Sequence, residues 1–281
     1  MKRIAKLRGC IDIRRLIYGV EARRLPAYDR KMARSFDSVL LTSMVDRQFL
    51  FDVTKDKHDR VMIVPNGVDP PLAQPLPISK RNPGEIVFVG HMHSLPNFDA
   101  AWNFARLVLP LIRSQRPDAC LRIIGPIRSF AKYRLSKLPG VRVEGHVASI
   151  SQALATARVG VCPTRAGAGI NNKVLDYMSN GLAVVSSRLG NEGLNAKPDE
   201  ELLIANSRLE WSAQVLRLLN DDALAQQLAD AGRRRVVQHH RWGSCMAPAV
   251  ERMKALLGEP QRDTSAPKKP RPAARRARTG T

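Results

Sequence analysis

The residues whose types and spacing best suit phosphate binding stand in one segment, GAGINNKVLDYMSNGLAVVSS, at 167–187. Small residues at its start allow the backbone to come close to a ligand. Asn171 or Asn172 can cap the helix predicted to follow, and the first N–H groups of a helix attract anions. Lys173 adds a positive charge to the first turn, and Asp176 follows about one turn later, where a carboxylate could accept hydrogen bonds from ribose hydroxyls. An ordinary loop before a packed helix explains these residues equally well.

From residue 85 onward, the chain alternates short apolar runs with helical patterns. This alternation predicts an α/β fold with a Rossmann-like, doubly wound parallel sheet that is buried on both faces. The predicted strands are 86–90, 121–125, 141–145, 159–162, 183–187 and 202–205. The predicted helices are 100–114, 130–137, 150–157, 172–180, 208–220 and 223–240, with Asp222 as the cap of the last one.

Glycines stand at the predicted carboxyl ends of several strands, namely Gly90, Gly125, Gly145 and the loop 167–169. Parallel sheets of this kind bind their ligands at that edge. The sequence therefore predicts that these loops form one nucleotide-binding cleft.

Four phrases in the same order resemble the carboxyl-terminal half of a GT-B glycosyltransferase of family four, the glycosyl transferases group 1. They are VPNGVD at 64–69, IVFVGHMHSLPNFDAA at 86–101, GVRVEGHV at 140–147 and GINNKVLDYMSNGLAVVSS at 169–187. The last phrase is similar to a motif of bacterial exopolysaccharide sugar transferases. The resemblance implies retaining transfer of a sugar from a nucleoside diphosphate sugar to a glycan or lipid-linked acceptor, in exopolysaccharide or cell-envelope glycan synthesis.

The resemblance also implies a donor site at the carboxyl edge of the sheet. The family's ribose-binding acid falls on Asp176, and recognition of the base falls near His146 and Val147. Backbone N–H groups of Gly169 and Ile170 are expected to contact the sugar. The donor-binding residues expected in this way are Gly90, His91, His146, Val147, Gly169, Ile170, Asn171, Asn172, Lys173 and Asp176.

Three positions depart from the family's motif. Its first acid falls on Ala168, its phosphate-binding arginine on His91 and its lysine on Pro96. Lys173 and the helix N-terminus are then the candidates for diphosphate binding, and no catalytic residue is assigned. The departures also leave open an inactive remnant that binds only a nucleotide sugar or a protein.

The length of 281 residues is short for two complete Rossmann-like halves. We expect a partial acceptor-side domain at 1–63, an interdomain linker at 64–84, a nucleotide-sugar-binding domain at 85–258 and a disordered basic tail at 259–281. The resemblance thus implies a truncated amino-terminal domain, whose missing part would carry the acceptor site and the family's usual catalytic histidine.

The chain is strongly basic, with 46 Lys and Arg against 25 Asp and Glu, or a net charge of +21. The cations of the amino-terminal stretch suit either an anionic membrane surface or solvated helix faces. Nucleic acid is disfavoured, because aromatic residues are only 5% of the chain and no zinc-binding spacing is present. We expect no bound metal or cofactor, since the pair His91 and His93 lacks a third ligand.

The same reading places the chain in the cytoplasm. Its four cysteines show no paired spacing, and no apolar run approaches the length of a membrane span. Peripheral contact with the inner face of the membrane is compatible with this location.

Overall fold

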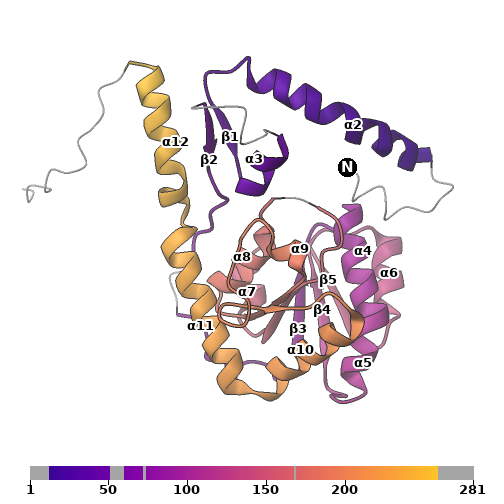
Figure 1. Ribbon diagram of the computed structural model, residues 1–281. Coiled ribbons are helices and arrows are strands. Elements are labelled where there is room, and N and C mark those ends of the chain that lie inside the picture. Colours follow the sequence, from indigo (N-terminus) through magenta and orange to yellow (C-terminus); the bar gives the residue numbers. More distant parts are fainter. Residues whose placement is uncertain (1–12, 51–59, 72–73, 168, 259–281) are drawn as a thin grey trace, which may run out of the picture.

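The structure, a computed structural model, describes residues 13–50, 60–71, 74–167 and 169–258. Ala168, the first twelve residues and the basic tail fall outside these ranges. Six parallel strands form the larger sheet, in the order β5-β4-β3-β6-β7-β8 (Figure 1). They are β3 (Glu85–Val89), β4 (Cys120–Ile124), β5 (Val141–Gly145), β6 (Val159–Cys162), β7 (Ala183–Ser186) and β8 (Leu203–Ile204).

This strand order is the 3-2-1-4-5-6 order of a Rossmann fold when β3 is counted as the first strand. Every neighbouring pair in the sheet is parallel. The predicted fold class is therefore confirmed. The order reverses between β3 and β6, and this reversal marks the point at which such sheets bind ligands.

Helices cover both faces of the sheet. One face packs against α4 (Leu95–Asn103), the π-helical turn η2 (Phe104–Val108), α5 (Leu109–Arg113), α6 (Ser129–Ser136) and α10 (Arg208–Asn220). The other packs against α7 (Ile150–Leu154) and α8 (Asn172–Ser179). The remaining helical segments are η1 (Ile78–Lys80), α9 (Arg188–Asn191), α11 (Asp222–His239) and α12 (Trp242–Leu256).

The start of α4 and the cap of α11 differ from the sequence-based prediction. The helix expected from residue 100 begins at Leu95, because Ser94 occupies the N-cap position and Pro96 suits the first turn. The cap of α11 is Asp221, whose Oδ1 accepts from the backbone N–H of Leu224 at 2.9 Å. Asp222, which was expected there, instead pairs with the buried guanidinium of Arg158 at 2.6 Å.

The amino-terminal part contains α2 (Ile13–Ala33), β1 (Val39–Leu41), α3 (Met44–Leu50) and β2 (Val61–Ile63). β1 and β2 form a separate two-stranded parallel sheet. The chain then enters the larger domain, where Val68 donates its N–H to the carbonyl oxygen of His240 at 2.7 Å. From there α12 runs back toward the end of the molecule where the amino-terminal part lies (Figure 1). No helix of the described ranges is both long and apolar enough to cross a membrane.

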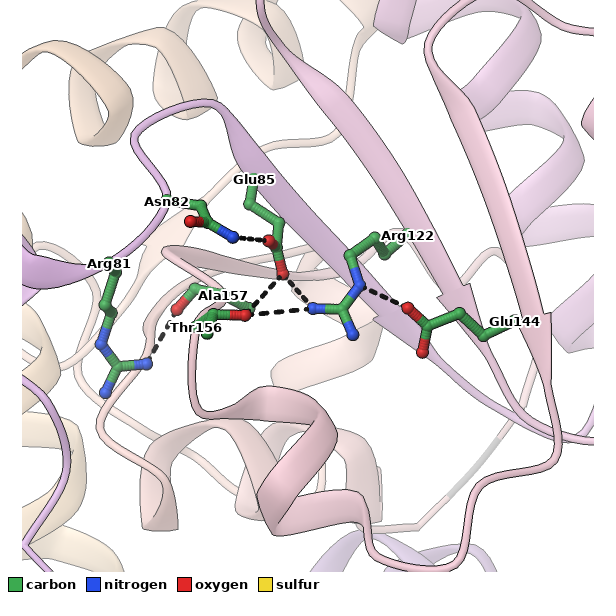
Figure 2. Close-up of polar contacts among 7 residues, drawn as sticks. All are labelled: Arg81, Asn82, Glu85, Arg122, Glu144, Thr156 and Ala157. Atoms are coloured by element: carbon green, nitrogen blue, oxygen red, sulfur yellow. Dashed lines mark hydrogen bonds and ion pairs between the residues drawn. The ribbon is translucent and has the colours of Figure 1, made fainter.

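Buried charges stabilise the amino edge of the larger sheet (Figure 2). The carboxylate of Glu85 forms an ion pair with Arg122, which also contacts Glu144 at 2.7 Å. Arg81 donates to the carbonyl oxygen of Ala157 at 2.8 Å, and its burial lowers its pKa to about 10. Since loss of one partner would leave an uncompensated buried charge, this network fixes the sheet at the edge opposite the predicted cleft.

Tyr177 joins β3 to β6 at the point where the two strands separate. The strands pair only through Ile86 and Val87 of β3. Further along, the Tyr177 hydroxyl accepts from the N–H of Val89 at 2.7 Å and makes a longer 3.4 Å contact with the carbonyl oxygen of Val161. This fully buried side chain therefore satisfies backbone groups that the sheet itself leaves unpaired.

Gly160 of β6 makes room for this arrangement. A Cβ atom at this position would collide with the Tyr177 ring. The glycine in the strand is thus explained by the close approach of α8 to the sheet.

We expect Tyr177→Phe to lower the free energy of unfolding by about 1–3 kcal/mol, because the buried N–H of Val89 loses its acceptor. Urea denaturation measures the change. The matched control is Tyr133→Phe, which removes a hydroxyl from a 61% exposed ring and should cost less than about 0.5 kcal/mol. Equal stability of the two variants would contradict the bridging role.

Candidate functional site

The candidate site lies at the carboxyl edge of the sheet, where the strand order reverses. The loop after β3 contains Gly90 and His91, and the loop after β6 leads into α8. In this arrangement the N-terminus of α8 and the first turn of α4 come from neighbouring strands. Both can therefore contribute to one cleft.

Lys173 connects α8 to the loop after β3. Its Nζ donates to Oδ1 of Asn97 at 3.0 Å, and Nδ2 of Asn97 donates to the carbonyl oxygen of His91 at 3.2 Å. The same ammonium lies 5.3 Å from the centre of the Phe88 ring, a cation–π contact. An ammonium has three N–H donors, so donors remain for an anionic ligand after Asn97 takes one.

Asp176 is a mostly buried acid next to this lysine. Burial raises its pKa to about 6, while the charge of Lys173 acts in the opposite direction. Within the described ranges the Asp176 carboxylate accepts no hydrogen bond. A carboxylate that is largely removed from water and still lacks donors is well suited to accept hydrogen bonds from a ligand's hydroxyl groups.

The two asparagines before Lys173 do not cap the helix with their side chains. Asn171 occupies the N-cap position, but its Nδ2 donates to the carbonyl oxygen of Gly190 at 3.1 Å. Asn172 accepts from Nδ2 of Asn66 at 2.7 Å, which joins the helix to the VPNGVD segment. The N-terminus of α8 therefore keeps its positive end free of a side-chain cap.

The loop before α8 is fixed by close backbone packing. Gly169 has a φ of +74°, and a Cβ atom at Gly193 would overlap the Gly169 carbonyl oxygen. The Ile170 side chain is buried in the core that also contacts Val147. On its outer side, a Cβ atom at Gly169 would lie 3.3 Å from Oγ1 of Thr42, so the amino-terminal part reaches this loop.

The structure does not bring every expected donor residue into contact with α8. His146 follows Gly145 at the same edge of the sheet, but its side chain is exposed, and no interaction between it and α8 is found in the described ranges. The His91 side chain is exposed as well and contacts His93 edge to face, with 4.8 Å between ring centres. His91 thus joins the cleft through its backbone carbonyl.

Five polar residues around this edge were not predicted from the sequence. Asn97 holds Lys173, and Arg165 of the loop after β6 pairs with Asp99 at 3.2 Å. Thr42 donates to Oδ2 of Asp46 at 3.1 Å, and both face Gly169. Of these residues, only Arg165 could have been selected from the sequence, because it is a positive charge in the glycine-rich loop. The roles of the others depend on contacts between distant segments.

No group of three or more His, Cys, Asp and Glu side chains that could hold a metal ion is found among the residues that the structure describes. A hollow of about 470 Å³ lies beside the cleft, between η2 and α10, and Arg165 and Arg208 contribute to its lining.

Comparison with known proteins gives one family and one curated relative. Residues 83–221 match the family model described as glycosyl transferases group 1. An uncharacterized 44.6 kDa protein in the cps region of Klebsiella pneumoniae is 25% identical over 201 residues. That alignment covers 67% of this chain and 49% of the relative, so the chain spans about half the length of the curated relative.

Solved structures confirm the GT-B fold. Sucrose-phosphate synthase from Thermosynechococcus elongatus matches with a TM-score of 0.68 and 18% identity, over 92% of this chain and 66% of that one. Anabaena HepE in complex with UDP-glucose matches with a TM-score of 0.65 and 12% identity, over 82% and 67%. Residues 83–221, the part that matches the group 1 glycosyltransferases, hold all six strands of the larger sheet and α8.

Proposed function

We propose that this chain transfers a sugar from a nucleoside diphosphate sugar to a glycan or lipid-linked acceptor, with retention, in exopolysaccharide or cell-envelope glycan synthesis. The observation that carries the proposal is the placement of Lys173 and the mostly buried Asp176 one turn apart in α8, where the charge of Lys173 acts on the acid. A cation and an acceptor carboxylate one turn apart match a diphosphate and the ribose next to it. The UDP-glucose complex of HepE, a structural neighbour, supports this class of ligand.

In the proposed complex, the ribose hydroxyls donate to Asp176 and the diphosphate lies at Lys173 and the α8 N-terminus. The backbone N–H groups of Gly169 and Ile170 face the sugar, and the base lies toward His146 and Val147. The donor would then extend from the sheet edge toward the amino-terminal part, which reaches Gly169. We propose a cytoplasmic location for the reaction, because nucleotide sugars are cytoplasmic donors.

The chemistry proposed for these groups is electrostatic. As the bond between the anomeric carbon and the diphosphate breaks, negative charge grows on the leaving oxygen. Lys173 and the helix N-terminus stabilise that charge in place, because Asn97 already orients the ammonium. No bound cofactor is part of the proposal.

A second candidate is a remnant that binds a nucleotide sugar or a protein without turnover. It is favoured because few positively charged side chains at the site are available to bind a diphosphate. Pro96 lies in the first turn of α4 and offers no charge, and Arg165 already pairs with Asp99. The experiments below separate binding from turnover.

Binding tests the role of Asp176. Titration calorimetry with UDP-glucose should show that Asp176→Asn weakens affinity about ten- to a hundredfold, through weaker hydrogen bonds to the ribose. Asp118→Asn is the matched control, because this acid pairs with Arg116 in the loop before β4, at the opposite edge of the sheet. Equal affinities of the two variants would argue against ribose binding by Asp176.

The pH dependence of the same affinity provides an independent test. Since burial raises the pKa of Asp176 to about 6, the ionised acceptor is lost as the pH falls below this value. Affinity of the wild type should drop about tenfold between pH 7 and pH 5. The drop should be absent from Asp176→Asn, which removes this carboxylate and keeps the other groups of the site. A drop of the same size in both proteins would contradict the assignment.

Turnover tests the role of Lys173. Release of UDP, followed in the presence of a lipid-linked glycan acceptor, should fall about a hundredfold in Lys173→Ala, because a charge-assisted contact to the leaving diphosphate is worth about 3 kcal/mol. Lys197→Ala, which changes an exposed lysine before β8, should keep the wild-type rate. Donor binding without turnover in the wild type, across a panel of uridine and guanosine donors, would favour the remnant.

A further inference from the structure

Two large aromatic side chains project into solvent from α6. Phe130 is 72% exposed and Tyr133 is 61% exposed, whereas Leu135 on the opposite side of the helix is fully buried. Residues three apart lie on the same side of a helix, so the two rings form one patch. Exposed rings of this size are unusual on a protein surface that contacts only water.

The cations around these rings are not balanced by acids. Arg128, Lys132, Arg134 and Lys137 are all exposed, and none of them forms an ion pair with a carboxylate in the described ranges. The segment 119–143 contains no Asp or Glu at all. Arg134 and Lys137 follow Phe130 and Tyr133 by four residues and therefore lie on the same side of α6. We call Phe130, Tyr133, Arg134 and Lys137 the aromatic–basic face.

Cation–π contacts extend this face onto α4. The guanidinium of Arg134 lies 4.4 Å from the centre of the Trp102 ring and 5.8 Å from that of Phe130. The ammonium of Lys137 lies 5.2 Å from the Tyr133 ring centre. The helix α6 lies beside α4, on the side of the domain away from α11 and α12 (Figure 1). The face is therefore held in place by its neighbour and stays open to a partner.

We propose that the aromatic–basic face binds the surface of an anionic phospholipid bilayer. Aromatic rings favour the headgroup layer of a membrane, and each Lys or Arg near it gains from the negative surface potential. Phe130 and Tyr133 enter the headgroup layer, while Arg134 and Lys137 pair with lipid phosphates. Nucleic acid fits less well, because cations already lie over these rings, whereas stacking of bases needs open ring faces.

This inference is independent of the donor site. The face lies on α6 and the donor residues lie on α8 and its loop. The protein can therefore lack vesicle binding and still bind UDP-glucose, or the reverse, so the two proposals can be rejected independently. A membrane at this face would also place the domain where lipid-linked acceptors lie, which connects it to the proposed function without depending on it.

The test is sedimentation of the full chain with phosphatidylcholine vesicles, with and without phosphatidylglycerol. Arg134→Gln combined with Lys137→Gln should lower affinity for the anionic vesicles about thirtyfold. Lys80→Gln combined with Lys197→Gln removes the same net charge from exposed positions elsewhere, so it controls for attraction by the whole basic chain. Equal affinities of the two double variants would overturn the proposal.

A second pair of variants tests the rings. Phe130→Ser should weaken vesicle binding about tenfold, whereas Leu209→Ser, which changes a side chain that is 74% exposed on α10, should have no effect. Both side chains are exposed, so both variants should fold. The same proteins are then titrated with a single-stranded oligonucleotide. Loss of oligonucleotide binding with unchanged vesicle binding would assign the face to nucleic acid and overturn the membrane proposal.

Discussion

The separation of β3 from β6 is the constraint on which the rest of the site depends. Parallel strands that part at the point of reversal leave backbone groups without partners, and Tyr177 fills that gap from α8. Its burial fixes the rotation of the helix about its axis. Because successive residues of an α-helix differ by about 100°, a buried Tyr177 leaves Asp176 at the border of the core, on the same side of α8 as Lys173. The interaction that closes the sheet therefore also positions the acid.

The charged side chains at the two edges of the sheet differ in whether they have partners. At the amino edge, Glu85 and Arg122 are buried, paired and satisfied. At the carboxyl edge, Asp176 is mostly buried and lacks donors, so its ionisation is costly and its pKa rises. That cost is recovered when a ligand supplies hydrogen bonds. A sheet edge that leaves a carboxylate in this state is better suited to binding than to stability.

Much of the fold follows from the sequence, because each strand is a short apolar run between turn residues. The β6 and β5 segments were predicted at their observed bounds. The N-cap of α11 was harder to predict, because Asp221 and Asp222 are adjacent acids that differ only in their partners. The partner of Asp222 is Arg158, which lies far away in the chain. In the site, Lys173 and Asp176 could be selected by helical spacing. Asn97 and Thr42 could not, because their roles arise from contacts that exist only after folding.

The most direct measurement of the central claim is a crystal structure of the chain with UDP-glucose bound. We predict that both ribose hydroxyls lie within hydrogen-bonding distance of the Asp176 carboxylate, with the diphosphate between Lys173 and the first turn of α8. A nucleotide bound elsewhere, such as in the hollow between η2 and α10, or one whose ribose faces away from Asp176, would contradict this account.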